Sequence, residues 1–375
     1  MRDDEAFREW VHPFEAFQEL TELVATDGKR VVAFLGSGMS GTDYVSWKNL
    51  VCQLVSRCEV VLDSDDRELL CKGDAAALLR LAGRAKSEDG PEYWRALAEE
   101  FGRPTSDSRS WARYQLLMAL GLQAYVTTNF DPLLLKQFQL CAGSRYGEDI
   151  RVPPAQGTLG ADGSAFVYLH GGYDAHEEGR HRLLGNLVLT SDDFDEEYSP
   201  TGSAGLFVRD LMRANNVVFL GCELRERGLS DALEAARDIR HAQKARGIDA
   251  GYELRDHKRV ILLPSNVPMA AWQQPLDQPD PARYFAHSEL QGEGSGKTPA
   301  EVRLRMDELH AEQKRDAELD TDCGIRVVRY DNTQGDYAVL WRTLWHWTQR
   351  ERPSVTLQGM SPLPGSEDRG DEPHG

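Results

Sequence analysis

The feature that most constrains this sequence is a repeated alternation of short, continuous apolar runs with longer segments of helical periodicity. The apolar runs lie at 31–35, 124–128, 165–169, 217–220, 259–263 and 325–330. Between them, apolar residues recur at spacings of three and four, which is typical of amphipathic helices. Continuous apolar strands are typical of strands buried on both faces, and their alternation with helices indicates a parallel sheet. The sequence therefore predicts an α/β fold with a doubly wound parallel sheet.

The periodicity also suggests how the chain is organised around this sheet. Residues 5–26 have helical spacing, so residues 1–30 are predicted to form an N-terminal helix. Residues 31–350 are predicted to form the main domain, with a helical insertion at about 64–120. The tail at 353–375 is rich in Pro, Gly, Ser and acidic residues, a composition that predicts disorder.

Charge and composition exclude several classes of protein. The 43 basic and 61 acidic residues give a net charge of −18, which argues against a broad grip on a nucleic-acid backbone but not against a local basic patch. No apolar run approaches the roughly 20 residues that span a bilayer. The N-terminus is charged and lacks a secretory apolar segment, and the six cysteines are dispersed without a CxxC pair. We therefore expect a cytoplasmic protein with free thiols and no metal site.

Polar and glycine residues follow directly after five of the predicted strands. These segments are Gly36–Gly41, Thr128–Asp131, His170-Gly171, Gly221-Cys222 and Tyr330-Asp331. Ligands of open α/β sheets bind at the carboxyl ends of the strands. The five segments are therefore predicted to converge on one crevice.

The first of these segments, Gly36-x-Gly38-x-x-Gly41, matches the glycine pattern of dinucleotide-binding loops. Glycines let backbone N–H groups approach a pyrophosphate closely, and a helix N-terminus favours its charge. Here the next helix is predicted to begin only at about Ser46. The loop thus differs from that of dehydrogenases, in which the glycines open the helix directly.

Taken in order, the motifs resemble those of sirtuin-like NAD-binding domains. They are Gly-Ser-Gly-Met-Ser at 36–40, Thr-Thr-Asn-Phe-Asp at 127–131, Leu-His-Gly at 169–171 and Gly-Cys at 221–222. Ser46-Trp47 and the segment from Leu189 to Tyr198 are similar to a prokaryotic branch associated with anti-phage defence. The resemblance covers roughly residues 20–350, and it implies a Rossmann-like sheet that binds NAD.

The resemblance also implies a role for each motif residue. Asn129 would position the ribose or water, His170 would act as the general base, and Asp131 would stabilise the developing cation. The residues that would bind NAD are Gly36, Ser37, Gly38, Ser40, Trp47, Thr128, Gly221, Cys222, Tyr330 and Asp331.

The chemistry of these residue types agrees with such roles. Cleavage of the nicotinamide–ribose bond places positive charge on the sugar, which a carboxylate favours. An Asn side chain both donates and accepts hydrogen bonds, and a His titrates near neutrality. Two plainer interpretations stay open: Asn129–Asp131 as a turn that caps the next helix, and His170 as a hydrogen-bonded core residue.

The sequence departs from the family in two places. The four-cysteine zinc module of protein-deacylating sirtuins is missing, and the usual Gly-x-Pro segment is replaced by Asp43-Tyr44-Val45. The expected activity is therefore hydrolysis of NAD⁺ to nicotinamide and ADP-ribose, with water as the acceptor. The alternatives are a module that senses NAD or ADP-ribose without cleaving it, and a deacylase with a zinc-free groove.

The resemblance further implies a role in anti-phage defence by NAD depletion. Such an activity has to be held silent until infection, and no sensor domain is evident in the sequence. We therefore expect self-assembly into a homo-oligomer and a separate partner, such as a HerA-type ATPase or a short Argonaute.

A second glycine-rich segment, Gly294–Thr298, is similar to a phosphate-binding loop of nucleotide triphosphatases. The first glycine of that motif is replaced by Gln291, and no convincing strand precedes the segment. We interpret it as a flexible insertion loop.

Overall fold

The computed structural model describes most of the predicted elements. The described residues are 7–27, 31–41, 43–102, 110–142, 150–151, 165–175, 181–222, 224, 229–235, 237–238, 258–265, 272, 299–331 and 338–351. The tail at 353–375 and the segment Gly294–Thr298 lie outside these residues.

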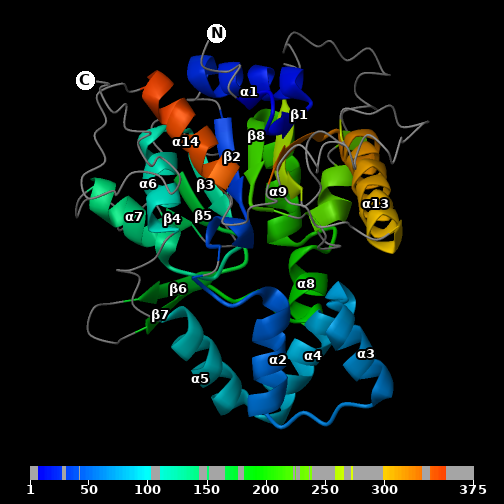
Figure 1. Cartoon of the computed structure of the whole chain (residues 1–375). Coiled ribbons are helices and arrows are strands. Elements are labelled where there is room, and N and C mark those ends of the chain that lie inside the picture. Colours follow the sequence, from blue (N-terminus) through cyan, green and yellow to red (C-terminus); the bar gives the residue numbers. More distant parts are fainter. Residues whose placement is uncertain are drawn as a thin grey trace, which may run out of the picture.

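An eight-stranded sheet forms the centre of the molecule (Figure 1). Its strand order is β1-β10-β9-β8-β2-β3-β5-β4, and every neighbouring pair is parallel except β1 with β10. The strands are β1 (Val11–His12), β2 (Val31–Leu35), β3 (Ala124–Thr127), β4 (Ile150–Arg151), β5 (Ala165–Tyr168), β8 (Asn216–Leu220), β9 (Arg259–Ser265) and β10 (Arg326–Asp331).

Helices cover both faces of this sheet, as in a doubly wound fold. The helices are α1 (Phe14–Asp27), α2 (Trp47–Arg57), α3 (Ser64–Lys72), α4 (Ala75–Glu88), α5 (Gly90–Phe101), α6 (Trp111–Ala119), α7 (Leu133–Ala142), α8 (Ser191–Glu197), α9 (Ser203–Ala214), α13 (Pro299–Cys323) and α14 (Ala338–Glu351). The predicted α/β fold with its mostly parallel, Rossmann-like sheet is confirmed.

The central strand β2 shows why the sheet needs two hydrophobic layers. Val31, Ala33 and Leu35 face one cluster, which contains side chains of α1, α6, α7 and α14. Val32 and Phe34 face the other cluster, with side chains of α9 and α13. Successive strand residues point to opposite faces, so a strand covered on both sides has to be apolar throughout.

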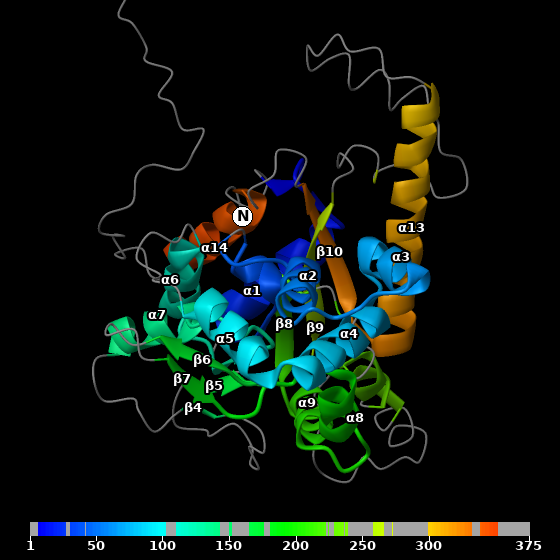
Figure 2. The ribbon, with the colours of Figure 1, turned by 90° about the horizontal axis from the view of Figure 1, so that it is seen from below.

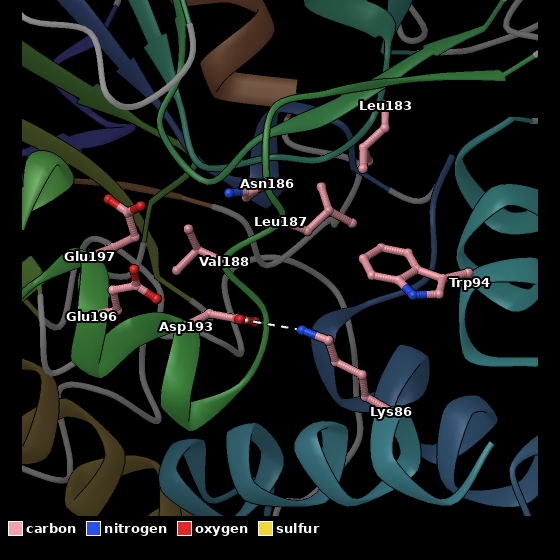
Figure 3. Close-up of a pocket in the computed structure, with 9 residues that line it drawn as sticks. All are labelled: Lys86, Trp94, Leu183, Asn186, Leu187, Val188, Asp193, Glu196 and Glu197. Atoms are coloured by element: carbon pink, nitrogen blue, oxygen red, sulfur yellow. Dashed lines mark hydrogen bonds and ion pairs between the residues drawn. The ribbon is translucent and has the colours of Figure 1, made fainter. Parts of the chain in front are cut away.

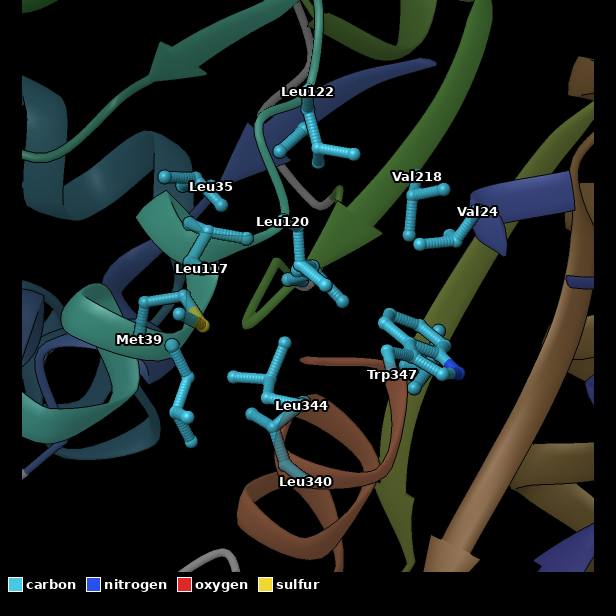
Figure 4. Close-up of a cluster of buried hydrophobic side chains, with 14 of the residues drawn as sticks. Val24, Leu35, Met39, Leu117, Leu120, Leu122, Val218, Leu340, Leu344 and Trp347 are labelled. Carbon is cyan, nitrogen blue, oxygen red and sulfur yellow. The ribbon is translucent and has the colours of Figure 1, made fainter. Parts of the chain in front are cut away.

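The first cluster joins the two ends of the described chain. Trp347 of α14 and Val24 of α1 lie in the same buried group as Leu117 of α6 and Leu35 of β2 (Figure 4). The indole N–H of Trp347 donates to the hydroxyl of Thr21 at 3.0 Å. Helix α1 therefore packs into the core of the sheet, rather than lying apart from it.

The N-terminal helix begins later than the sequence predicts. Helical spacing predicts a helix over residues 5–26, but α1 starts at Phe14. Residues 11 and 12 instead extend the sheet, with Val11 opposite Tyr330 of β10. Pro13 precedes the helix, a position where its missing N–H costs no helical hydrogen bond.

The helical insertion has a core of its own. Helices α3, α4 and α5 share a third cluster with α2, which precedes the predicted bounds of about 64–120; the cluster also takes in Tyr173, Leu187 and Leu189 from the segments after β5. In Figure 1 these helices lie together below the sheet, and in Figure 2 they are seen in front of it. Helix α6 belongs to the first cluster on the sheet, whereas the sequence places residues up to about 120 in the insertion.

The sequence analysis did not predict a small hairpin that follows β5. Strands β6 (Gly172–Ala175) and β7 (His181–Leu184) pair in an antiparallel sheet of their own. Their sequences alternate polar and apolar residues weakly, so they lack the apolar runs that mark the central strands.

Within the described part of the chain, no helix is long and apolar enough to cross a membrane.

Candidate functional site at the carboxyl ends of the strands

Four of the five predicted segments leave the sheet side by side. Strands β8, β2, β3 and β5 are neighbours, and all run in the same direction. The segments that follow them start at 221, 36, 128 and 169 and therefore lie at one edge of the sheet. The fifth segment follows β10, which is separated from β8 by β9. Asn129 and His170 follow the neighbouring strands β3 and β5, so the topology brings them to the same edge of the sheet.

The glycine loop after β2 nests against the turn after β8. The N–H of Gly36 donates to the carbonyl of Leu220 at 3.0 Å, and that of Gly38 to the carbonyl of Gly221 at 2.9 Å. A Cβ at Gly36 would lie 2.5 Å from the Gly221 oxygen, and one at Gly38 would lie 2.8 Å from the Gly221 Cα. Gly221 itself has a φ of +66°, which favours glycine. The glycines are therefore needed for the contact between these two turns, a reason that the sequence pattern does not reveal.

The rest of the loop closes on itself as a short 3₁₀ turn over Ser37–Met39. The N–H of Met39 donates to the carbonyl of Gly36, and the N–H groups of Ser40 and Gly41 donate to that of Ser37. The side chain of Ser40 is buried, whereas Ser37 is exposed at the tip. Among the residues of this loop that are predicted to bind NAD, Ser37 is the most exposed.

Helix α6 holds the glycine loop from the other side. The guanidinium of Arg113 donates to the carbonyl of Gly38 at 3.1 Å and to the hydroxyl of Ser110 at 2.7 Å. Ser110 in turn donates its hydroxyl to the carbonyl of Ser40, and its N–H to the carboxylate of Asp43 at 2.8 Å. The sequence analysis did not identify these residues. The sequence signal for Arg113 is weak: it is the one charged residue of a mostly apolar helix.

Asn129 lies at the centre of a buried hydrogen-bond network. Its side-chain amide donates to the carbonyl of Gly36 at 3.0 Å, and lies 3.1 Å from the hydroxyl of Ser40 and 3.3 Å from that of Tyr114. The backbone N–H of Asn129 donates to the Thr127 hydroxyl at 3.0 Å. Asn129 is therefore tied to the glycine loop, and Tyr114 of α6 is a further member of the network that the sequence analysis missed.

Asp131 joins this network through Ser40. The Ser40 hydroxyl donates to Oδ2 of Asp131 at 2.5 Å, while Oδ1 accepts the N–H of Leu133 at 3.1 Å. The second contact caps α7, so the plainer interpretation of this turn holds for Asp131. Burial raises the pKa of Asp131 to about 6, although the hydrogen bonds from Ser40 and Leu133 oppose the shift. The carboxylate can serve as a cap and still lie beside the glycine loop.

His170 is buried under the end of helix α8. Nε2 of His170 lies 2.7 Å from the hydroxyl oxygen of Tyr198. The His170 ring meets the ring of Phe194 edge-on, with centroids 5.1 Å apart. Only 3% of His170 is exposed, and burial lowers the pKa of the imidazole to about 3. In this arrangement His170 is a neutral, hydrogen-bonded residue, as the plainer interpretation proposes.

The remaining predicted residues lie near this edge in different environments. Thr128 is half-buried, and its N–H donates to the Leu35 carbonyl at 3.2 Å. The thiol of Cys222 is buried and points back to the Phe34 carbonyl at 3.4 Å. Trp47 begins α2 and packs on the core of the insertion.

The segment after β10 lies farther away. Tyr330 is fully buried in the first hydrophobic cluster, and Asp331 ends β10 beside Ser265 of β9. The structure therefore does not bring these two residues to the network around Asn129.

A row of aromatic rings connects the insertion to the strand ends. Phe101 of α5 lies 5.9 Å from the ring of Tyr44, 5.6 Å from that of Phe130 and 5.8 Å from that of Tyr173, measured between centroids. The ring of Phe130 lies 6.5 Å from that of His170. These ring contacts join the insertion to the edge of the sheet. The access of a ligand to His170 and Asn129 therefore depends on the position of the insertion.

A pocket of about 320 Å³ opens beside this region (Figure 3). It is lined by Lys86, Trp94, Leu183, Asn186, Leu187, Val188, Asp193, Glu196 and Glu197. Lys86 pairs with Asp193 at 3.3 Å across the pocket, and Glu197 accepts the hydroxyl of Ser203 at 2.6 Å. The charged groups of Lys86, Asp193 and Glu197 are therefore engaged in contacts with α8 or at its end. The lining residues do not point to a particular ligand.

The described cysteines and acidic residues do not gather into a metal site. Cys52, Cys58, Cys71 and Cys222 are free thiols. Within the described ranges, no group of three or more His, Cys, Asp or Glu side chains is placed to hold a metal ion.

Comparison with known proteins finds a family match over part of this chain. Residues 123–266 match the family model of the SIR2-like domain. The matched range runs from β3 to β9 and contains Asn129, Asp131, His170 and Gly221. The glycine loop follows β2, which precedes this range in the sequence but lies between β3 and β8 in the sheet. The chain is also similar to the uncharacterized protein y4cA of Sinorhizobium fredii, with 27% identity over 205 residues. That match covers 51% of this chain and 16% of y4cA. The protein thus carries a SIR2-like domain over residues 123–266, a domain that is associated with NAD-related activity.

Proposed function

We propose that this protein is an NAD⁺ glycohydrolase, which cleaves the nicotinamide–ribose bond and releases nicotinamide and ADP-ribose. The observation that carries the proposal is the hydrogen-bonded group of Asn129, Asp131 and Ser40 against the glycine loop. His170 follows the next strand of the same edge. An amide, a carboxylate, an imidazole and a glycine turn are the groups that such a reaction needs.

Each group has a role in this chemistry. The carboxylate of Asp131, ionised above a pKa of about 6, stabilises the positive charge that develops on the ribose. Asn129 orients a ribose hydroxyl or the attacking water, since an amide both donates and accepts. His170 removes the proton through the unprotonated nitrogen of its neutral imidazole, which is a weak base in this buried arrangement because its pKa is about 3. Ser37 and the exposed side of the glycine loop face the pyrophosphate of the bound dinucleotide.

The acceptor and the biological role form part of the same proposal. Water is the acceptor, since the sequence lacks the cysteine pattern of the zinc module that accompanies the peptide groove of deacylating sirtuins. Consumption of NAD in an infected cell would serve defence against phage. Such an activity has to be controlled, and we propose control by self-assembly and by a partner protein such as a HerA-type ATPase or a short Argonaute.

One observation favours a second candidate, a module that senses NAD or ADP-ribose without cleaving it. Asn129 and His170 are both buried, and both bond to other groups of the protein. A site in which these bonds persist after binding would hold the ligand without turnover. The two candidates differ in whether nicotinamide is released.

The test is to incubate the full chain with NAD⁺ and measure free nicotinamide, alone and with the products of neighbouring genes. Asn129→Ala and His170→Ala are expected to lower the rate at least 100-fold. Matched controls are Asn215→Ala, which changes the end of α9 before β8, and His310→Ala on the exposed face of α13. Both controls are expected to retain the wild-type rate.

The outcomes separate the candidates. Binding of NAD⁺ without nicotinamide release in any assembly supports the sensing module. Turnover that survives both Asn129→Ala and His170→Ala contradicts the assignment of the chemistry to this edge.

A further inference from the structure

The contact between Tyr198 and His170 places a second hydroxyl at the proposed base. Nε2 of His170 lies 2.7 Å from the phenol oxygen of Tyr198, within the range of a strong hydrogen bond. His170 is 3% exposed, so Tyr198 takes the place that water would otherwise have at this nitrogen. Neither the glycine pattern nor the motif at 169–171 points to this tyrosine.

Helix α8 is built to keep Tyr198 at this position. Phe194 lies in α8 and Tyr198, four residues later, is its C-cap residue; their rings stack with centroids 5.5 Å apart. The ring of His170 meets both of them edge-on, at 5.1 Å from Phe194 and 5.8 Å from Tyr198. The imidazole is therefore enclosed by two rings of one helix, and its orientation depends on that helix.

Both ends of α8 are fixed by side chains. At the start, the hydroxyl of Thr190 accepts the N–H of Asp193, and the Asp193 carboxylate accepts the N–H of Thr190 in return. Lys86 of the insertion pairs with the same carboxylate at 3.3 Å. At the other end, Glu197 accepts the hydroxyl of Ser203 at 2.6 Å. Contacts at both ends of α8 thus support the position of Tyr198 over His170.

The chemistry of the two groups indicates which one donates. A neutral imidazole has one donor nitrogen and one acceptor nitrogen. A phenol is a stronger acid than the N–H of neutral imidazole, so the favoured arrangement has Tyr198 donating and Nε2 accepting. The imidazole proton then lies on Nδ1. In this tautomer Nε2 carries the lone pair that a general base uses.

We propose that Tyr198 is a positioning residue of the site, whose phenol donates to Nε2 of His170 and occupies the place of the hydroxyl or water that His170 deprotonates. This inference rests on the proposed function of His170 as a base. The phenol keeps the imidazole in the tautomer that accepts a proton, and it competes with the substrate complex for the same nitrogen. Substrate binding has to displace the Tyr198 hydroxyl before the reaction begins.

The first test reads the tautomer of His170 directly. The full chain is labelled with ¹⁵N-histidine, and the ring nitrogens are observed by long-range ¹H–¹⁵N correlation, with His170→Gln to assign the signals. We expect a protonated Nδ1 in the wild type and a shift toward a mixture of tautomers in Tyr198→Phe. The matched control is Tyr93→Phe, which removes another buried phenol within the core of the insertion. Its His170 signals are expected to equal those of the wild type.

The second test uses steady-state kinetics of nicotinamide release in the active assembly. Phenylalanine keeps the ring that stacks on Phe194, so Tyr198→Phe is expected to fold as the wild type does. It is expected to lower KM for NAD⁺ at least five-fold, because the substrate no longer displaces a hydrogen bond. The kcat is expected to change less than two-fold, because in the substrate complex the reacting hydroxyl donates to Nε2 in place of the phenol and keeps the same tautomer.

The outcomes are distinct for the inference and for the proposed function. A proton on Nε2 in the wild type, unchanged His170 signals in Tyr198→Phe, or a lower kcat/KM in this variant would overturn the inference. If neither the wild type nor any variant releases nicotinamide, the proposed function fails. The tautomer measurement then still decides whether the Tyr198 phenol donates to Nε2.

Discussion

At the scale of single residues, the buried carboxyl group of Asp131 links the candidate site to stability. Its pKa rises to about 6 in the folded protein, from an ordinary value of 3.8. Between these two pH values the folded state binds more protons than the unfolded state, so the free energy of unfolding falls as pH rises. Ionised Asp131 is therefore a cost that the fold carries at neutral pH.

This cost predicts how the variant Asp131→Asn differs from the wild type. Relative to the variant, the wild type is expected to lose up to about 3 kcal/mol of stability between pH 4 and pH 7. Urea unfolding of both proteins across this range measures the difference, in which contributions from other carboxyl groups cancel. A difference that is constant with pH, or that favours the wild type at pH 7 over pH 4, would contradict the raised pKa.

At the scale of elements, the start of helix α8 controls the environment of His170. Thr190 is buried and forms a reciprocal pair of hydrogen bonds with Asp193. Thr190→Ala is expected to cost about 1 kcal/mol and to loosen the first turn of the helix. Hydrogen exchange measured by mass spectrometry is expected to show faster exchange over Ser191–Glu197 than in the wild type. Thr201→Ala, at an exposed position after the helix, serves as the control. Equal exchange in both variants would refute the role of this cap.

The same scale shows what the sequence can and cannot predict. Signals within one segment succeed: the apolar runs mark β2, β3, β5, β8, β9 and β10. Contacts between distant segments do not appear in local patterns. The bond from Arg113 to the glycine loop and that from Tyr198 to His170 depend on how helices cross the sheet edge. Strand β1 escapes prediction because it has two residues and gains its order from β10.

The candidate site was predictable to the level of the sheet edge. Asn129, Asp131 and His170 follow neighbouring strands, so the rule for parallel sheets is enough to bring them to one edge. Their burial and their hydrogen bonds within the protein were not predictable, because Ser40, Tyr114 and Phe194 become neighbours only in the folded chain. Whether these residues bind and cleave NAD stays a prediction for the experiments above.

At the scale of the whole molecule, the fold depends on the contact between α1 and α14, the first and last helices of the described residues. Trp347 is 2% exposed and bonds to Thr21, across the layer that α1 and α14 form on the sheet. Trp347→Ala is expected to lower the free energy of unfolding by about 3–5 kcal/mol, because it leaves a cavity and an unpaired hydroxyl. Trp94→Ala removes an indole that is 37% exposed and is expected to cost about 1 kcal/mol or less. Urea unfolding compares the two, and similar losses would show that α14 does not complete the core.

The pairing of strands across the chain has a consequence for synthesis on the ribosome. Strand β2 leaves the exit tunnel early, but its partners β3 and β8 follow roughly 90 and 185 residues later, and α14 comes last. Until then, the nascent chain carries apolar strands that have no neighbour to pair with. Long-range pairing of this kind slows folding and leaves apolar, aggregation-prone surface exposed in the meantime. This protein is therefore expected to complete this edge of the sheet only near the end of translation, and to depend on chaperones in the meantime.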